Sequence, residues 1–560
     1  MGKASRRKRK KRLSPLKEAN ASQEAQGILG PMASPKVGER QNACVALANC
    51  TLSSLKRLEK KGLYRAMLPR VQDSSWNVRE QAIGALRSAS MLGGDDTCER
   101  MFAEDIMTPC IALLESEKGE QALLTFCNFE KDLASRAAQS CVELLYNMCE
   151  VVDQAVQRLA QSNVLSLFVR CVFGSACKEV KVSVARLLHV CSEQSGEFAR
   201  DVFLSSEQLS NIAPLLSSEE LPLGCALNIC GVLVNGAQAG KTTVPTDSVL
   251  ELVLLIAKRA LHTDAAFWSG DASPNGGWEN QCLDQLLALE VLANSCAEAS
   301  GGEGSSDVPL CTAACQKFIE HGMLSDCFSV LSSCADAAAS EKTDSIIAST
   351  QQRAAGCVDN VVQNAPESLL SSSTYFDFRK AFELVLAWLK GCVSPNHSSP
   401  ASGAIASLAF SLLRRMGASC SDVLRGMDDA ALRPLLYASA FSQDTETRAA
   451  SVASLGILAQ QDALGSAARI RIAASIAKAT SDPSDAVLVE ALNAIFDVFG
   501  DDGTHQWFVE SKVIELLSPL VGDLERRIRI DGRDMEVERL ERLEETLDNL
   551  KRFIEYKTNF

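Results

Sequence analysis

A glycine-containing stretch in mid-chain has the residue types of a phosphate-binding loop. It reads NGAQAGKTT over residues 235–243. A Walker loop needs four residues between its glycines, whereas Gly236 and Gly240 are separated by three. The stretch also follows an apolar helical pattern, although a phosphate loop follows a strand. We therefore interpret it as a turn between repeats and expect no nucleotide cofactor.

The five histidines and 21 cysteines lack the spacing of a catalytic or metal site. The histidines are scattered and show no partner pattern for nucleophilic catalysis. The cysteines form no C-x-x-C pair, and Cys311 and Cys315 have no matching second pair. Most lie on apolar helical faces, as in SCVELLYNMC, where a thiol acts as a small hydrophobic group. We expect reduced thiols, no metal and no enzymatic activity.

The first twelve residues are strongly basic although the whole chain is acidic. The basic residues of this leader are Lys3, Arg6, Arg7, Lys8, Arg9, Lys10, Lys11 and Arg12. The chain has a formal net charge of −14, so without these eight residues 48 basic side chains face 70 acidic ones, a charge of −22. A run of Lys and Arg can lie along an acidic receptor surface, which favours an import signal for an importin-type receptor.

Three other interpretations of the leader remain open. A nucleic-acid tail would gain from counterion release, but the acidic body would repel the same polyanion. A membrane anchor fits less well, because Ser5 and Arg6 miss the myristoylation pattern. A plain solvated tail is the third. We expect neither a membrane nor a direct nucleic-acid partner.

Polar residues recur at one position when the apolar helical patterns are aligned. This asparagine column contains Asn49, Ser88, Asn147, His189, Asn235, Asn294 and Asn364. An asparagine ladder can bond the N–H and C=O groups of an extended peptide, so the column indicates a cargo groove. The alternative is that an asparagine near a helix end simply caps that helix.

Repeated apolar helices must position these residues. Patterns such as RAAQSCVELLYNMCE, VKVSVARLLHVCSE and AVLVEALNAIFDVFG carry Ala and Leu at helical spacing and return about every 40–65 residues. In DSSWNVREQAIGAL, residues 73–86, an Asp and a Val-Arg pair precede a helix as in HEAT repeats. Strand signals are nearly absent. The sequence therefore predicts an all-α armadillo/HEAT-repeat α-solenoid superhelix with a disordered basic N-terminal tail.

Irregular Gly, Pro and Ser clusters suggest how the array is divided. We expect a tail at 1–37, armadillo-like repeats at 38–298, a linker at 299–310, HEAT-like repeats at 311–500 and C-terminal capping helices at 501–560. The last helix should place one apolar stripe against the preceding repeat. That stripe contains Val537, Leu540, Leu543, Leu547, Leu550 and Ile554.

The length of the apolar runs and the composition of the segment after the leader indicate where in the cell the protein resides. The longest apolar run, VLELVLLIA at 249–257, is shorter than the roughly 18 residues of a membrane span. The leader is followed by LSPLKEANASQEAQ and not by the apolar core of a secretory signal. We expect the protein in the cytoplasm and nucleus.

Three blocks resemble the symportin family of HEAT-repeat-containing proteins, also called HEAT-repeat-containing protein 3. They are MGKASRRKRKKRLSP at the start, VREQAIGALRSASMLGG followed by DIMTPCIALL, and LDNLKRFIEYK near the end. The resemblance implies an adaptor that carries the two large-subunit ribosomal proteins binding 5S rRNA into the nucleus, with an import receptor holding the leader. The acidic solenoid would then shield basic cargo.

Two departures leave details of this resemblance open. Family members can carry a long acidic loop, whereas CAEASGGEGSSDV holds only Glu298, Glu303 and Asp307, so the second cargo contact is unassigned. No Pro-Tyr dipeptide follows the leader, so the importin is unassigned too. Two other functions also remain: a karyopherin-type receptor that binds the GTPase Ran, and a cytosolic scaffold of a signalling complex.

Overall fold

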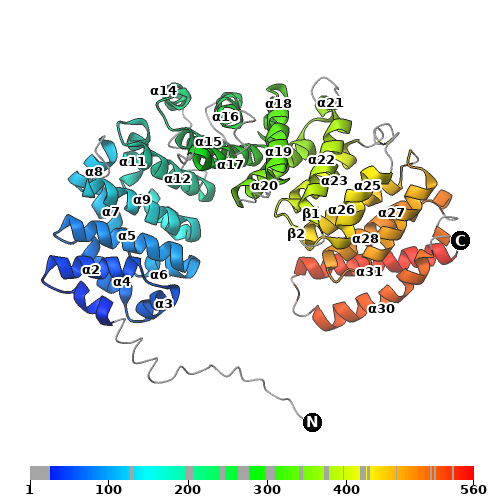
Figure 1. Cartoon of the computed structure of the whole chain (residues 1–560), viewed down its shortest axis with the longest axis horizontal. Coiled ribbons are helices and arrows are strands. Elements are labelled where there is room, and N and C mark those ends of the chain that lie inside the picture. Colours follow the sequence, from blue (N-terminus) through cyan, green and yellow to red (C-terminus); the bar gives the residue numbers. More distant parts are fainter. Residues whose placement is uncertain are drawn as a thin grey trace, which may run out of the picture. The chain divides into compact units, whose positions relative to one another are not determined.

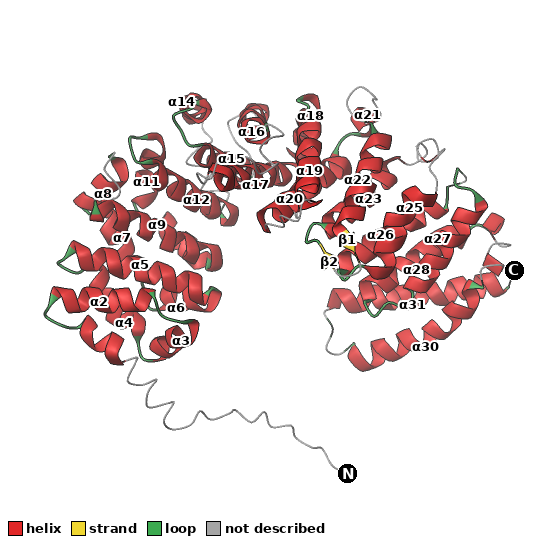
Figure 2. Cartoon of the chain, viewed as in Figure 1, coloured by secondary structure: helices red, strands yellow, loops and turns green. Residues whose placement is uncertain are grey.

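The fold was obtained as a computed structural model. It describes residues 26–559 except 126–131, 196–205, 240–245, 263–276, 298–309, 340–344, 371–376, 395–396, 417–423, 425–428, 462, 505–507, 510–511, 533–534 and 536. Almost all of the described chain is helical (Figure 2). By its contacts the chain divides into two compact units, residues 1–249 and 250–560. Each unit is described separately below.

The first unit is a stack of helices in which the longer ones form a continuous row. Its helices are α2 (Val37–Ala48), α3 (Leu52–Lys60), α4 (Leu63–Val71), α5 (Trp76–Gly93), α6 (Asp95–Ala103), α7 (Met107–Glu115), α8 (Glu117–Leu124), α9 (Leu133–Val151), α10 (Asp153–Ala160), α11 (Val164–Phe173), α12 (Lys178–Gln194), α14 (Ser206–Ser217) and α15 (Leu223–Gln238), and α16 (Thr246–Leu261) crosses the boundary between the units. Helices α2, α5, α9, α12 and α15 pack one on the next (Figure 1). We call this line the first row.

The second unit repeats the arrangement. Its elements are α17 (Gly277–Cys296), α18 (Leu310–Glu320), α19 (Met323–Ala339), α20 (Ser345–Asn364), α21 (Glu367–Leu370), α22 (Phe378–Cys392), β1 (Val393–Ser394), β2 (His397–Ser398), α23 (Ser402–Met416), α25 (Asp429–Phe441), α26 (Thr445–Ala459), α27 (Ser466–Ala479), α28 (Asp485–Phe499), the 3-10 turn Asp502–Thr504, α30 (Val513–Asp531) and α31 (Val537–Thr558). Helices α17, α20, α23, α26 and α28 form the second row, and α31 packs on α28. The all-α solenoid prediction is confirmed.

Small side chains at helical spacing allow the row helices to approach closely. On α9, Ala138, Cys141, Leu145 and Met148 are fully buried at i, i+3, i+7 and i+10. Between α26 and α28 the approach is closer still, because a Cβ built on Gly456 would lie 2.8 Å from the Cβ of Ala494. The abundance of Ala, Gly and Cys in the sequence follows from this packing.

The HEAT-like segment at 73–86 forms the expected link between successive row helices. Asp73 lies just before α5 and accepts hydrogen bonds from Arg40 Nε at 2.7 Å and Arg40 Nη2 at 2.8 Å. It also accepts from the backbone N–H of Ser75 at 3.0 Å, which fixes the start of α5. The second unit repeats the motif, with Arg448 Nε donating to Asp482 at 2.8 Å.

Ordered structure begins earlier than expected. We placed residues 1–37 in a tail, but residues 26–32 are helical and Met32 is 1% exposed. Arg40 Nη1 also donates to the carbonyl oxygens of Ser34 and Pro35, so the connection to α2 is held by the first repeat. The remaining tail, residues 1–25, lies outside the described residues.

The contact boundary also differs from the expected linker. The chain divides between Val249 and Leu250, within α16, whereas we expected the division at 299–310, most of which lies outside the described residues. After α22, Val393 and Ser394 pair with Ser398 and His397 as two short antiparallel strands.

The last helix caps the second unit through part of the predicted stripe. Leu543, Leu547 and Leu550 are buried against α28 and α30. Val537 is 73% exposed, so its inclusion in the stripe was wrong. It is the first residue of α31.

Candidate partner-binding face

The asparagine column follows the C-terminal halves of the row helices, where its amides bond to the preceding row helix. Asn147 Nδ2 on α9 donates to Ser90 Oγ on α5 at 2.7 Å. Asn235 Nδ2 on α15 donates to Ser192 Oγ on α12 at 2.9 Å. In the second unit, Asn364 Nδ2 on α20 donates to the carbonyl oxygen of Cys296 at 3.0 Å. Neighbouring repeats are therefore joined by these amides.

This bonding leaves the amides capacity for a second partner. An asparagine amide has two N–H donors and one acceptor oxygen, and each bond above uses one donor. Asn147, Asn235, Asn294 and Asn364 are all partly exposed. The column thus has a structural role that the sequence did not reveal, and it still presents polar groups at the surface of each row.

The first member of the column is a helix cap. Asn49 is the C-cap of α2, and its Nδ2 donates to the carbonyl oxygen of Val45 at 2.9 Å. At this position the structure agrees with the capping alternative. Ser88, the next member, is half-buried on α5.

His189 is a packing residue within the first row. It is 6% exposed, and its Nδ1 lies 3.3 Å from Asn228 Oδ1 on α15. Because Asn228 Nδ2 donates to the carbonyl oxygen of Gly224, its Oδ1 faces the ring and Nδ1 of His189 carries the hydrogen. A Cβ on Gly231 would lie 2.1 Å from His189 Nε2, so the ring fills the space above that glycine. The prediction that His189 contacts a bound peptide was therefore wrong, because its ring is buried.

The side chains of the first row are charged but not uniformly acidic. Arg136 Nε on α9 donates to Glu80 on α5 at 3.2 Å. The guanidinium of Arg186 on α12 lies 4.8 Å from the ring centre of Tyr146, whose hydroxyl donates to Glu150 at 2.8 Å. Basic and acidic side chains therefore lie close together at these two places on the first row. The sequence predicted the net acidity of the body but not this pairing.

Side chains of the next row helix also satisfy the C-terminal carbonyls of the one before. Gln194 Nε2 on α12 donates to the carbonyl oxygen of Cys149 at 2.6 Å. Arg415 on α23 donates to the carbonyl oxygens of Val362 at 2.7 Å and Ala365 at 3.0 Å. These carbonyls lack partners within their own helix. No sequence signal marked Arg415 or Gln194, because each contact spans a whole repeat.

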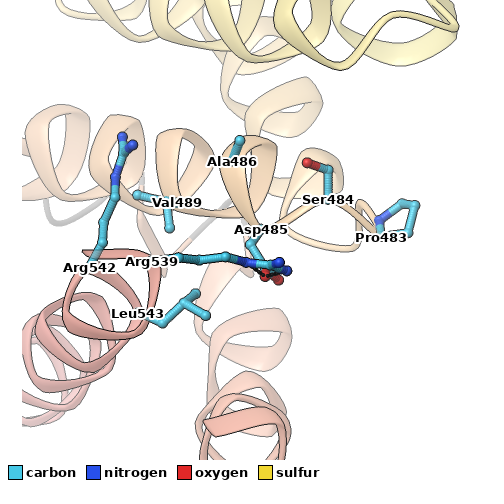
Figure 3. Close-up of a pocket in the computed structure, with 8 residues that line it drawn as sticks. All are labelled: Pro483, Ser484, Asp485, Ala486, Val489, Arg539, Arg542 and Leu543. Carbon is cyan, nitrogen blue, oxygen red and sulfur yellow. Dashed lines mark hydrogen bonds and ion pairs between the residues drawn. The ribbon is translucent and has the colours of Figure 1, made fainter. Parts of the chain in front are cut away.

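A pocket of about 460 Å³ lies between the start of α28 and α31, away from the asparagine column (Figure 3). Arg539 points at Asp485, and Arg542 Nη2 donates to Glu490 at 2.8 Å. Arg527 Nη1 also donates to Asp485, at 3.0 Å. Each of these arginines already bonds to a carboxylate of α28. We therefore assign these contacts to the packing of α30 and α31 against α28, and not to the binding of an anion.

The basic leader and part of the glycine-containing stretch lie outside the described residues. The receptor signal, Lys3 and Arg6 to Arg12, lies outside the described residues. The glycine-containing stretch at 235–243 was predicted to be a turn, but residues 235–238 are the last residues of α15, and residues 240–245 lie outside the described part. Among the described residues, no group of three or more His, Cys, Asp or Glu is arranged for a metal ion. Within the same residues no helix has the length and hydrophobicity needed to cross a bilayer.

Known proteins with similar sequences are repeat proteins. A family profile described as SYO1-like, TPR repeats matches residues 324–560. The human HEAT repeat-containing protein 3 is 26% identical over 242 residues, covering 41% of this chain and 35% of that protein. Syo2 of Schizosaccharomyces pombe, an armadillo repeat protein involved in nucleocytoplasmic transport, is 28% identical over 201 residues, covering 31% of this chain and 30% of that protein. The chain thus matches about a third of the length of these relatives.

A solved structure supports the architecture alone. The crystal structure of an engineered protein aligns with 85% of this chain and 98% of its own, with a TM-score of 0.50 and 16% sequence identity. The named relatives are repeat proteins and not members of enzyme families.

Proposed function

We propose that this chain is a member of the symportin family, and that it acts as a non-enzymatic nuclear import adaptor and chaperone for the large-subunit ribosomal proteins that bind 5S rRNA. The observation that carries the proposal is the separation of charge: eight basic residues lie in the first twelve, and the rest of the chain carries −22. The basic leader suits an acidic receptor, and the acidic solenoid suits basic cargo. Such a protein shuttles between cytoplasm and nucleus.

The asparagine column is the proposed contact for an extended cargo segment. In the first unit Asn147 on α9 and Asn235 on α15 are partly exposed, and in the second unit so are Asn294 on α17 and Asn364 on α20. An extended peptide repeats its N–H and C=O groups along its length, so amides on successive helices can bond it without reading its side chains. Asn49 and His189 are left out of this contact, since one caps α2 and the other is buried.

Isothermal titration of the full chain against each 5S-binding ribosomal protein at physiological salt tests the proposal. We expect submicromolar one-to-one binding to at least one of them. Deletion of residues 1–12 should abolish binding to an importin-type receptor and leave cargo affinity unchanged. Absence of heat with both ribosomal proteins would contradict the adaptor function, and binding of Ran would favour a karyopherin-type receptor.

A triple variant tests the column itself. Asn147→Ala, Asn235→Ala and Asn294→Ala together should weaken cargo binding by about tenfold or more, since each lost hydrogen bond is worth roughly 1 kcal/mol. Helical content by circular dichroism should stay the same. Asn49→Ala is the matched control, because that amide bonds its own helix. Equal affinity of the triple variant and the control would remove the column from the cargo site.

A further inference from the structure

A smaller pocket lies between two neighbouring helices of the second unit, α25 and α27, which pack together (Figure 1). Its volume is about 280 Å³. The residues that line it are Leu432, Arg433, Leu436, Ala468, Arg471 and Ile472. We call it the α25–α27 groove. It shares no residue and no helix with the asparagine column.

The floor of the α25–α27 groove is apolar. Leu432 is 2% exposed and Ile472 is 1% exposed, and Leu436 is half-buried. Leu432 and Leu436 are four residues apart on α25, and Ala468 and Ile472 are four apart on α27, so each helix supplies one apolar wall. An apolar side chain that enters the groove leaves water for these walls.

Two arginines stand at the rim of this floor. Arg433 follows Leu432 on α25, and Arg471 precedes Ile472 on α27, so each helix contributes one guanidinium beside a floor residue. Both arginines are exposed. Of the six residues that line the groove, none is acidic. The groove therefore combines an apolar floor with a positively charged rim.

The helix on one side of the groove is basic within an acidic solenoid. Helix α27 contains Arg469, Arg471 and Lys478 and no acidic residue, whereas the chain after the leader carries −22. Arg469 Nε donates to the carbonyl oxygen of Ala459 at 3.1 Å, so this arginine packs against the preceding helix. Arg471 and Lys478 are exposed. The local charge at the groove is thus opposite to that of the chain as a whole.

Aromatic side chains continue this surface along α25. Tyr437 lies four residues after Arg433, on the same side of the helix. Its ring centre is 5.1 Å from that of Phe441, which is 59% exposed. Aromatic residues and arginine are the residue types enriched in protein interfaces. The surface beside the groove therefore has the composition of a protein-binding site.

We propose that the α25–α27 groove docks an acidic peptide segment of a partner protein, with one apolar side chain in the pocket and flanking carboxylates on Arg433 and Arg471. A guanidinium binds a carboxylate through two parallel hydrogen bonds. Small-molecule sites have about 300–1,000 Å³, so a pocket at the bottom of this range suits a single anchor side chain. This partner is opposite in charge to the proposed basic cargo, so the inference stands independently of the cargo site.

A nucleic acid fits the groove less well than an acidic peptide. Its phosphate backbone needs a row of basic side chains, and the acidic solenoid repels a long polyanion. The apolar floor would also have no role in binding phosphates. A short acidic segment with one apolar side chain uses both the floor and the rim.

The test measures fluorescence anisotropy of the fluorescein-labelled peptide GEEDELEDEEG with the full chain at physiological salt. We expect a Kd of about 100 µM or tighter. The same peptide with alanine in place of leucine should bind at least about fivefold more weakly, because the pocket loses its occupant. This comparison leaves the protein unchanged, so it does not depend on the folding of a variant.

Charge reversal tests the rim. Arg433→Glu combined with Arg471→Glu should weaken binding of the peptide about tenfold or more, with unchanged helical content by circular dichroism. The matched control is Arg379→Glu combined with Arg526→Glu, which alters the net charge equally at side chains 52% and 61% exposed on α22 and α30. The control should bind as the wild type does.

Three results would overturn the proposal. Equal weakening in the two double variants would mean that binding depends on net charge and not on the groove. Absence of binding to the wild type would remove the docking site. Displacement of the peptide by an equal concentration of a short oligouridine would assign the arginines to a nucleic acid instead.

Discussion

Arg40 donates two hydrogen bonds to the carboxylate of Asp73, from Nε at 2.7 Å and from Nη2 at 2.8 Å, and both residues are less than a tenth exposed. Arg40 belongs to α2 and Asp73 precedes α5, so the pair joins two successive row helices. Arg70 adds a third bond to the same carboxylate at 2.9 Å. The fork of a guanidinium fits a carboxylate in a way that an ammonium group cannot.

Replacement of Arg40 by Lys should destabilise the first unit even though the charge is kept. Lysine retains one bond to Asp73 and cannot reach the carbonyls of Ser34 and Pro35 at the same time. We expect a loss of about 2 kcal/mol in the free energy of unfolding, measured by urea denaturation. Arg65→Lys is the control, because its ion pair with Glu104 is 79% exposed on the arginine side and should cost less than about 0.5 kcal/mol. Similar losses in both variants would mean that the two-point geometry does not matter.

The stability supplied by Asp73 should disappear in acid. Burial alone would raise the pKa of this carboxyl, but the bonds from Arg40 and Ser75 outweigh it and hold the pKa below the usual 3.8. A depressed folded-state pKa stabilises the protein above the unfolded-state value and loses that contribution as pH falls through the folded-state value. Urea midpoints of the wild type and Asp73→Asn should therefore differ most at neutral pH and converge below about pH 4. A gap that is independent of pH would show that the charge of Asp73 has no role.

Asp284 should lower the stability of the protein at neutral pH, whereas Asp73 raises it. It lies on α17, where burial raises its pKa to about 6. The unfolded chain ionises first as pH rises from 3.8 to about 6, so the folded state loses relative stability over that window and keeps the penalty above it. Asp284→Asn should stabilise the protein by about 1 kcal/mol at pH 7.5 and have no effect below about pH 4. Thermal unfolding at both pH values measures this, and equal shifts at the two pH values would contradict it.

Two helical glycines on the first row should respond oppositely to a methyl group. Gly231→Ala would place Cβ 2.1 Å from the His189 ring, so we expect a loss of about 1–3 kcal/mol in stability. Gly84→Ala meets no atom within 4 Å on α5 and should be neutral or stabilising by up to about 1 kcal/mol. Urea denaturation of both variants tests the contrast. A neutral Gly231→Ala would show that His189 can move aside.

The fold could be predicted from the sequence because each helix is marked by a pattern of residues close together in the chain. Periodic Ala and Leu identify each helix, and the spacing of Asp73 and Val78 marks the turn before α5. The partners of these residues are not local. Arg40 and Asp73 are 33 positions apart, and Asn147 and Ser90 are 57 apart, so helical phase identifies the face but not the contact. Alignment found the column of asparagines, yet only three-dimensional packing shows that their amides bond to the preceding repeat.

The ends of three row helices, α9, α17 and α20, are completed by a residue that lies one repeat further along the chain. Cys149 depends on Gln194 for its carbonyl partner, Cys296 on Asn364, and Val362 on Arg415. The stabilisation between repeats is therefore directional: the later repeat supplies the side chain that bonds to the end of the earlier one. Nearest-neighbour interface energies of this kind are typical of solenoid proteins. A truncation that stops after α20 would leave the last turn of that helix uncapped, so unfolding should begin at the new C-terminus and spread backwards one repeat at a time.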